Sequence, residues 1–232
     1  MDKLGVVIPA AGQGKRMGAG YNKQFLALMG EPILAHAIRP FQESPLVSEI
    51  IIVGAEGDLA TIKELVEHHR YNKVAVICKG GLQRQDSVRA GVQVLSSIIR
   101  RVVVHDGARP LLTLEMFHRF IEETENYSAA IMGIPVKDTI KQVDESGKVI
   151  ATLPRELLRA VQTPQIFERA ILEESHLQAE SSGYYGTDDA SLLEWMGYSV
   201  HVAEGDLENI KVTTPEDLWL AERIFAQRLS RL

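Results

Sequence analysis

The segment VVIPAAGQGKRMG, residues 6–18, indicates the fold class of this chain. It opens with a short apolar run rich in β-branched residues, which is typical of a buried strand and which stops at Pro9. A glycine-rich loop with a Lys-Arg pair follows directly. In open α/β sheets, ligands bind beyond the carboxyl ends of the strands. The segment therefore predicts an α/β protein whose first strand leads into an anion-binding loop.

Short apolar runs recur along the chain and alternate with helical patterns. None of the runs alternates cleanly between apolar and polar residues, so both faces of each strand should be covered, as in a parallel sheet. We therefore predict an α/β fold with a mostly parallel, doubly wound sheet in a single domain, residues 1–232. The predicted strands cover residues 4–9, 49–54, 73–78, 101–105, 129–136 and 198–203, and the predicted helices cover residues 33–42, 58–69, 86–97, 114–125, 187–196 and a stretch from residue 215.

Two stretches fall outside this alternation. Residues 138–155 are predicted to form a hairpin with the sequence DESG at its tip, and they carry so little apolar surface that the hairpin should leave the main body. An isolated hairpin with exposed edges is marginal in water, so we expect it to pair with a second copy. Residues 177–186 are polar and contain glycine, and we predict that they form a mobile loop.

Composition excludes several function classes. The formal net charge of −6 leaves no basic surplus for nucleic acid, so an anionic ligand must meet a few placed cations. Cys78 is the one cysteine, which excludes an intrachain disulfide and fits a reducing cytosol. The chain enters a strand within a few residues and has no apolar stretch of 18 residues. We therefore predict a cytoplasmic protein with no signal peptide, no membrane span and no nucleic-acid partner.

The glycine spacing of the first loop matches neither of two well-known nucleotide motifs. After Gly12 and Gly14, the dinucleotide fingerprint G-x-G-x-x-G would place its third glycine one residue before Gly18, and the pattern G-x-x-x-x-G-K-[ST] is absent. Glu56, after the second strand, keeps a nicotinamide-dependent dehydrogenase open as an alternative, because that class holds a ribose with an acidic residue at this position. Binding of NAD(P)H would test that alternative.

Cations gather in the same loop. Lys15 and Arg16 lie within it, and Lys23 follows in the sequence YNKQF. Backbone N–H groups combined with cations suit a triphosphate, whereas a diphosphate can rest on a helix N-terminus with fewer cations. The loop therefore favours a triphosphate, and a plain turn with solvated charges is the alternative.

Two further loops follow predicted strands at the same edge of the sheet. In KGGLQRQDSV, Gly80 and Gly81 would let the backbone approach a flat ligand, and Ser87 lies near a helix start. In HDGARP, Asp106 leaves a buried strand, where a carboxylate is costly unless it binds a cation or a hydroxyl group. Beside a triphosphate, Asp106 would hold Mg²⁺. A helix cap and a loop-bonded aspartate are the structural alternatives, but three converging loops favour a nucleotide site.

Eight motifs span nearly the whole chain in the order PAAGQGKRMG, KQF, GGLQRQDSV, HDGARP, PVKDTIK, LPRELLRAVQTPQ, TDDAS and ENIKVTTPEDL. On these motifs the chain resembles the 2-C-methyl-D-erythritol 4-phosphate cytidylyltransferases of non-mevalonate isoprenoid biosynthesis. The resemblance implies a Rossmann-like nucleotidyltransferase fold, CTP and Mg²⁺ as partners, and a homodimer that exchanges β-arms over residues 138–155. Gly107 stands where alanine is common in the family.

The resemblance also implies roles for individual residues. Arg16 and Lys23 would bind the triphosphate and stabilise the transition state, and Lys211 would hold the phosphates in line. On the arm, Thr139 and the catalytic Arg155 would reach the phosphate of the second substrate. The remaining implied contacts are the metal and ribose at Asp106, cytosine at Gly81 and Ser87, the nucleotide at Ala10, Ala11, Gly12 and Gly107, and pocket or supporting positions at Arg109, Thr163 and Thr187.

The chemistry of such a transfer agrees with these residue types. A phosphate monoester is already a nucleophile at neutral pH, so the site needs charge neutralisation and in-line positioning and no general base. Ribitol-5-phosphate cytidylyltransferases share the motifs and are the nearest alternative, although the double alanine in PAAGQGKRM favours the methylerythritol enzymes. A non-catalytic nucleotide sensor is a more remote alternative, and the complete set of Arg16, Lys23, Asp106 and Lys211 counts against it.

Overall fold

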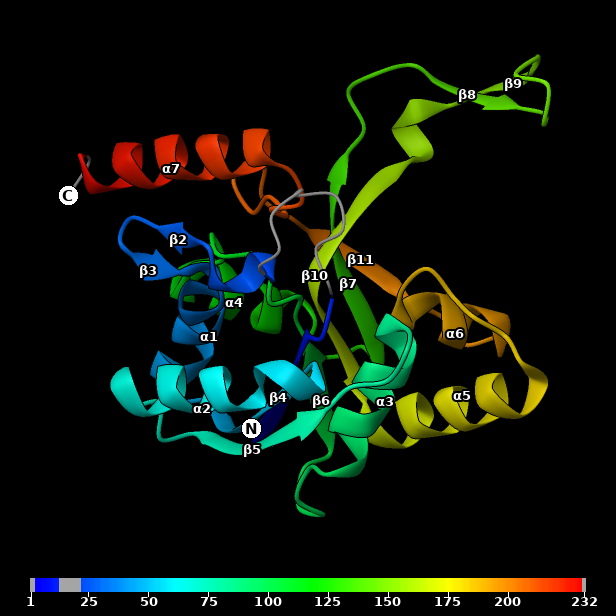
Figure 1. Cartoon of the computed structure of the whole chain (residues 1–232). Coiled ribbons are helices and arrows are strands. Elements are labelled where there is room, and N and C mark those ends of the chain that lie inside the picture. Colours follow the sequence, from blue (N-terminus) through cyan, green and yellow to red (C-terminus); the bar gives the residue numbers. More distant parts are fainter. Residues whose placement is uncertain (1–2, 13–21, 231–232) are drawn as a thin grey trace.

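The computed structural model describes residues 3–12 and 22–230, and within them the chain is built around a seven-stranded sheet (Figure 1). The strand order is β11-β7-β10-β6-β1-β4-β5. Strands β6, β1, β4 and β5 are parallel to one another, β7 and β11 are parallel, and β10 is antiparallel to both β6 and β7. The predicted mostly parallel sheet is confirmed. The strands are β1 (Leu4–Ala10), β4 (Val47–Gly54), β5 (Val74–Lys79), β6 (Arg101–Val104), β7 (Ala129–Pro135), β10 (Arg159–Glu168) and β11 (His201–Glu204).

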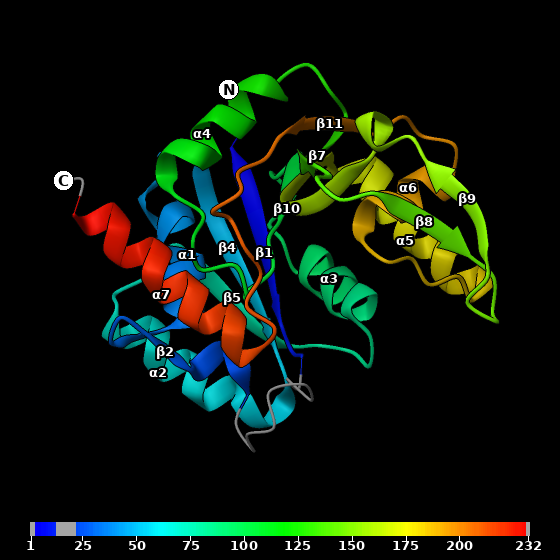
Figure 2. The same ribbon diagram turned by 90° about the horizontal axis from the view of Figure 1, so that it is seen from above.

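Helices cover both faces of this sheet (Figure 2). The helices are α1 (Ile33–Glu43), α2 (Leu59–His68), α3 (Arg84–Gln93), α4 (Leu114–Glu123), α5 (Arg169–Ser182), α6 (Asp189–Trp195) and α7 (Pro215–Leu229). One apolar cluster joins α1, α2 and α4 to Val6 and Ile8 of β1, and a second joins α3, α5 and α6 to Val7 of the same strand. Successive residues of a strand point to opposite faces, so the continuous apolar runs follow from this double cover. Within the described ranges, no helix is long and apolar enough to cross a membrane.

Short elements complete the main body beside α7. The segment between residues 22 and 32 packs its apolar side chains, including Leu28, against Ala221 of α7 in a third cluster. These elements are the 3-10 helix η2 (Lys23–Phe25) and the strands β2 (Ala27–Leu28) and β3 (Glu31–Pro32), and two further 3-10 helices are η3 (Glu56–Asp58) and η4 (Arg155–Leu157).

The predicted hairpin projects from the main body (Figure 1). Strands β8 (Ile140–Val143) and β9 (Val149–Leu153) pair antiparallel in a two-stranded sheet of their own. At the tip, Oδ1 of Asp144 accepts hydrogen bonds from the backbone N–H of Ser146 and of Lys148, both at 3.0 Å, and Gly147 has a φ of +83° that glycine adopts readily. The hairpin over residues 138–155 is therefore confirmed as a structural unit, which we call the arm.

The predicted loop over residues 177–186 is wrong in its first part, because residues 177–182 belong to α5. The buried stripe of α5 has helical spacing, at positions 172, 175, 176 and 179, but two of its members are Ser175 and His176. Polar residues on the buried side hid the helix from a pattern based on hydrophobicity. Gly183, with a φ of +65°, ends the helix in the left-handed conformation usual for this position.

Candidate active site

The carboxyl ends of β1, β5 and β6 surround a cavity of about 210 Å³. The three predicted loops supply most of its wall, and Lys23, Gln24 and Lys211 complete it from other parts of the sequence. The lining residues are Pro9, Ala11, Gly12, Lys23, Gln24, Gly81, Leu82, Gln83, Arg84, Ser87, Asp106, Gly107, Ala108 and Lys211. Arg16 and Lys15 lie outside the described residues. Ala10 is buried at the end of β1, directly before this wall.

A second hollow, of about 850 Å³, lies away from these loops. The residues that line it include Arg100, Arg101, Glu125, Glu168 and Arg169. Its described lining residues carry charges of both signs and include no glycine. A triphosphate needs cations and closely approaching backbone N–H groups. The smaller cavity therefore suits a nucleotide better.

Side chains that lie close to the backbone of Gly80 and Gly81 explain why glycine occupies both positions. A Cβ atom at Gly80 would lie 2.6 Å from Oγ of Ser87 and 2.8 Å from Cβ of Ala11, and a Cβ atom at Gly81 would lie 2.3 Å from Cβ of Asp86. The Gly81 N–H donates to Oγ of Ser87 at 3.2 Å, and that hydroxyl donates to the carbonyl of Gln83 at 3.1 Å. Ser87 therefore holds the shape of the loop from within α3, which begins at Arg84 rather than at the predicted residue 86.

We expect Gly81→Ala to raise the KM for CTP by about 10-fold, because the new methyl group forces the loop to shift by an amount that typically costs about 1–3 kcal/mol. Gly57→Ala is the matched control, since a Cβ atom there meets nothing within 4 Å. Steady-state kinetics with CTP as the varied substrate measures the effect. Equal KM values for Gly81→Ala, Gly57→Ala and the wild type would show that the close approach at Gly81 does not shape the nucleotide site.

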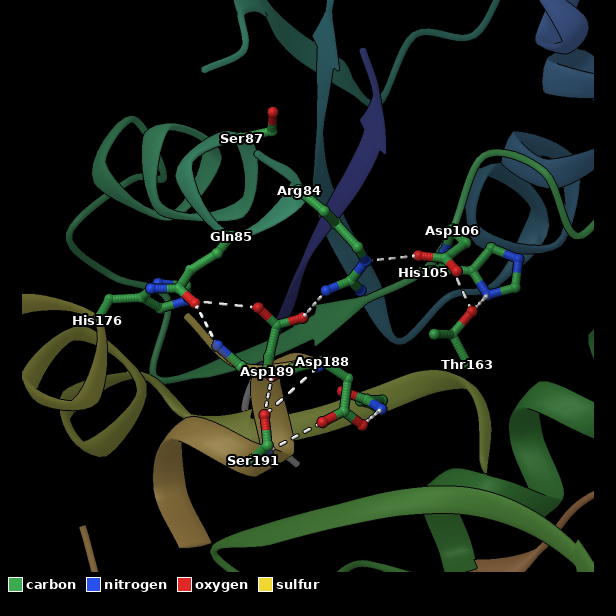
Figure 3. Close-up of polar contacts among 12 residues, drawn as sticks. Arg84, Gln85, Ser87, His105, Asp106, Thr163, His176, Asp188, Asp189 and Ser191 are labelled. Atoms are coloured by element: carbon green, nitrogen blue, oxygen red, sulfur yellow. Dashed lines mark hydrogen bonds and ion pairs between the residues drawn. The ribbon is translucent and has the colours of Figure 1, made fainter. Parts of the chain in front are cut away.

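Asp106 is the one carboxylate among the described lining residues, and two cations hold it. Figure 3 shows the contact with the first of them, Arg84. Its Oδ1 lies 2.9 Å from Nε of Arg84, and its Oδ2 lies 2.6 Å from Nζ of Lys211. Burial alone would raise the pKa of the Asp106 carboxyl group, but the positive charges of Arg84 and Lys211 outweigh burial and lower the pKa well below its ordinary value. Asp106 is therefore ionised at neutral pH, the form in which a carboxyl group binds a metal ion.

Three buried side chains behind the cavity wall support the Asp106 loop, those of Thr163, His105 and Arg109. The backbone N–H of Asp106 donates to Oγ1 of Thr163 at 3.0 Å, and the same hydroxyl lies 3.1 Å from Nδ1 of His105. Burial lowers the pKa of His105 to about 4, so the ring is neutral at pH 7. Nη1 of Arg109 donates to the carbonyl of Asn209 at 2.7 Å, which positions the loop that carries Lys211. Thr163, predicted as a pocket residue, and Arg109, predicted as a supporting residue, thus contact the wall without lining the cavity.

Six of the described predicted site residues do not line this cavity: Ala10, Arg109 and Thr163 are buried, and the other three are exposed. Thr139 and Arg155 are exposed at the base of the arm, and Nη1 of Arg155 donates to the carbonyl of Lys137 at 3.0 Å. Thr187 is exposed and directly precedes Asp188, whose side chain caps α6 by accepting from the Ser191 N–H at 2.9 Å. Within one chain, the described structure therefore assembles the nucleotide side of the predicted site and leaves the arm residues apart from it.

Arg84 and Asp189 are site residues that sequence reasoning missed. From the sequence, Asp189 is most simply part of a helix first turn, yet its side chain is 1% exposed and its Oδ2 lies 2.7 Å from Nη1 of Arg84. The two residues are 105 positions apart, so no local pattern connects them. The available signal is the position of Arg84 in GGLQRQDSV, three residues after a glycine pair that the sequence already assigns to the site.

A mostly parallel sheet with a cationic, glycine-lined cavity at its carboxyl edge is typical of α/β nucleotide-binding proteins. A sequence model of the family 2-C-methyl-D-erythritol 4-phosphate cytidylyltransferase matches residues 4–227. The chain therefore belongs to this family and is a CTP-dependent cytidylyltransferase.

Individual relatives agree with this assignment. The 2-C-methyl-D-erythritol 4-phosphate cytidylyltransferase of Halalkalibacterium halodurans is 48% identical over 226 residues, which cover 97% of this chain and 98% of the relative. The enzyme of the same name from Symbiobacterium thermophilum is 47% identical over 224 residues, which cover 97% of this chain and 93% of that enzyme. The crystal structure of 4-diphosphocytidyl-2C-methyl-D-erythritol synthase from Anaerococcus prevotii superposes with a TM-score of 0.86 at 28% identity, over 97% of this chain and 96% of that one.

Proposed function

We propose that this chain transfers the cytidylyl group of CTP to 2-C-methyl-D-erythritol 4-phosphate in the cavity described above, and that it releases pyrophosphate and 4-diphosphocytidyl-2-C-methyl-D-erythritol. Family membership supplies the reaction. The observation that supports the location is the cluster of Asp106, Lys211 and Arg84 beside the glycine loop at residues 80–81.

The reaction needs two anions to meet. A phosphate oxygen of the polyol phosphate attacks the α-phosphorus of CTP, the bond from that phosphorus to the oxygen bridging to the β-phosphate breaks, and the electron pair leaves with pyrophosphate. The attacking phosphate is largely a dianion at neutral pH, so no side chain has to remove a proton. The described lining residues fit this chemistry, because they include Lys23, Arg84 and Lys211 but no histidine or cysteine.

Lys211 is placed to change partners when CTP binds. Its side chain is 40% exposed, and in this structure its Nζ contacts Asp106. A triphosphate entering beside the glycine loops brings more negative charge than one carboxylate, so we propose that Lys211 turns to the phosphates and that Asp106 becomes available to a metal ion or the ribose. Lys23 also lines the cavity and would act on the same phosphates, as would Arg16.

The donor set around Asp106 fits a magnesium ion that arrives with the nucleotide. Among the described residues, no group of three or more His, Cys, Asp or Glu side chains could hold a metal ion. Mg²⁺ bound to nucleotides commonly takes one or two carboxylates and fills its other positions with phosphate oxygens and water. We propose that Asp106 holds Mg²⁺ in this way, and the ion would supply neutralisation of charge on the triphosphate.

We propose that the arm completes the site of a partner chain in a dimer. Thr139 and Arg155 are exposed and do not line the cavity of their own chain, although the family resemblance gives them to the second substrate. The arm also exposes Val143, Val149 and Ile150, each at least half accessible, together with strand edges. A two-fold dimer could cover both arms at once and bring each Arg155 to the partner's cavity.

Comparison of two acceptors tests the specific assignment. Purified protein is incubated with CTP, Mg²⁺ and either 2-C-methyl-D-erythritol 4-phosphate or ribitol 5-phosphate, and pyrophosphate release gives kcat/KM for each. We expect the methylerythritol substrate to have the higher value. A higher value for ribitol 5-phosphate would overturn the proposed acceptor while leaving cytidylyl transfer in place.

We expect Asp106→Asn to raise the Mg²⁺ concentration for half-maximal rate by about 10–100-fold, because asparagine keeps the shape but loses the charge that holds the ion. The melting temperature should change much less than the Mg²⁺ dependence. Glu64→Gln, an equivalent change at an exposed position of α2, is the control. An unchanged Mg²⁺ titration together with a large fall in melting temperature would assign Asp106 a structural role.

A further inference from the structure

Arg84 joins two carboxylates that belong to different parts of the fold (Figure 3). From the first turn of α3, its Nε contacts Oδ1 of Asp106 at 2.9 Å and its Nη1 contacts Oδ2 of Asp189 at 2.7 Å. The side chain of Arg84 is 28% exposed, against 10% for Asp106 and 1% for Asp189. The planar guanidinium therefore spans from the cavity wall to the buried start of α6.

Asp189 is a fixed anchor. Its Oδ1 lies 3.4 Å from Nε2 of His176, whose side chain is 2% exposed in α5. Burial alone would raise the pKa of Asp189, but the charge of Arg84 and the contact with His176 outweigh it and lower the pKa. A buried carboxylate is strongly destabilising without a partner, so Asp189 holds the guanidinium tightly.

A second contact fixes the same region. The side chain of Gln85, the residue after Arg84, donates from Nε2 to the carbonyl of Tyr184 at 3.0 Å and accepts from the Gly186 N–H at 3.0 Å. The first turn of α3 therefore contacts the segment 184–189 at two successive residues. This segment carries Thr187, which the family resemblance places at the substrate pocket.

We infer that Arg84 is a positioning residue for cytidylyl transfer, because it braces Asp106 at the nucleotide cavity against the buried Asp189. The inference rests on the proposed function. It explains why Asp106 has two cationic partners. Lys211 has an exposed side chain and is free to move to the phosphates, whereas Arg84 is anchored at its far end and keeps Oδ1 of Asp106 in place.

Three variants test the brace, Arg84→Gln, Arg84→Lys and Asp189→Asn. Loss of a group that orients a metal ligand typically costs about 10–100-fold in affinity or activity. We expect Arg84→Gln and Asp189→Asn each to lower kcat/KM for CTP, and to raise the Mg²⁺ concentration for half-maximal rate, by about that factor. Arg84→Lys should fail to rescue the rate, because one ammonium group cannot bridge both carboxylates as the fork does.

Arg89→Gln is the matched control. Arg89 lies on the same helix, and its ion pair with Glu180 also ties α3 to α5, but it does not line the cavity. We expect this variant to keep the wild-type kcat/KM and Mg²⁺ dependence. Rates are referred to folded protein, measured by thermal unfolding of each variant, so that a loss of stability is not counted as a loss of activity.

The double variant Arg84→Gln with Asp189→Asn separates a brace from two independent effects. If Asp189 acts through Arg84, the double variant should be no more than slightly worse than the more damaged single variant. The inference would be overturned if the losses of the two single variants multiplied in the double variant, if Arg84→Lys had full activity, or if Arg84→Gln had wild-type kinetics.

Calorimetric titration with CTP and Mg²⁺, without the acceptor, compares nucleotide binding by the same variants independently of turnover. A wild type that binds CTP but does not convert it would count against the proposed function and leave the brace measurable.

Discussion

Lys211→Ala is expected to lower kcat by about 10²–10³-fold, the usual consequence of removing one preorganised group that faces charge developing in the transition state. Negative charge builds on the oxygen that leaves with pyrophosphate, and Lys211 is the described cation that is both in the cavity wall and exposed enough to follow it. Because the interaction strengthens as the bond breaks, the loss should appear mainly in kcat. Lys23→Ala and Arg16→Ala should behave in the same way.

The kinetic pattern separates catalysis from ground-state binding. Lys79→Ala is the control, since Lys79 lies at the end of β5 and pairs with Glu56 at 2.7 Å outside the cavity lining. Lys79→Ala should leave kcat unchanged. If Lys211→Ala instead raises the KM for CTP and leaves kcat untouched, the lysine binds the substrate without acting on the transition state.

Mixing two inactive variants, Arg155→Ala and Lys211→Ala, should restore activity. In an arm-exchanged dimer, Arg155 acts in the partner's cavity, whereas Lys211 acts in its own. A mixed dimer then has one site with both lesions and one site with neither, so it should regain at most about half of the wild-type activity by symmetry. Two different affinity tags allow mixed dimers to be isolated after subunit exchange and assayed by pyrophosphate release.

The controls for this experiment are the unmixed variants and a mixture whose lesions lie in the same cavity. Lys211→Ala mixed with Lys23→Ala should give no recovery, because each site of the mixed dimer keeps one lesion. Isolated mixed dimers of Arg155→Ala and Lys211→Ala that remain inactive would show that Arg155 acts within its own chain. The arm-exchange proposal would then be wrong.

Local patterns predicted the fold well where the signal lies within a few residues. The run at residues 4–9 forms β1. The last helix begins as predicted at Pro215, where the side chains of Thr214 and Asp217 each accept a hydrogen bond from the other residue's backbone N–H. α5 was missed because its buried stripe contains Ser175 and His176, so hydrophobic periodicity was weak. Trp195 has the spacing of a core residue in the sequence, yet it is 43% exposed and stacks on Tyr184.

The nucleotide side of the site was predictable because its residues follow strands. The carboxyl ends of parallel strands meet at one edge, so Gly81 and Asp106 could be expected near each other without a structure. The bridge from Asp106 through Arg84 to Asp189 could not be predicted from the sequence, because it depends on where the start of α6 lies relative to α3. A charged residue in a helix first turn has the same local pattern whether it faces solvent or a buried partner.

The central claim is that this chain joins CTP and 2-C-methyl-D-erythritol 4-phosphate directly, without hydrolysing either. The ³¹P NMR spectrum of the purified protein with both substrates and Mg²⁺ tests it in one measurement. The account predicts that the α-phosphorus of CTP and the phosphorus of the acceptor convert together into one diphosphate product, with an equal amount of pyrophosphate and no CMP or CDP. Loss of CTP to CMP or CDP while the acceptor signal persists, or an unchanged spectrum, would contradict it.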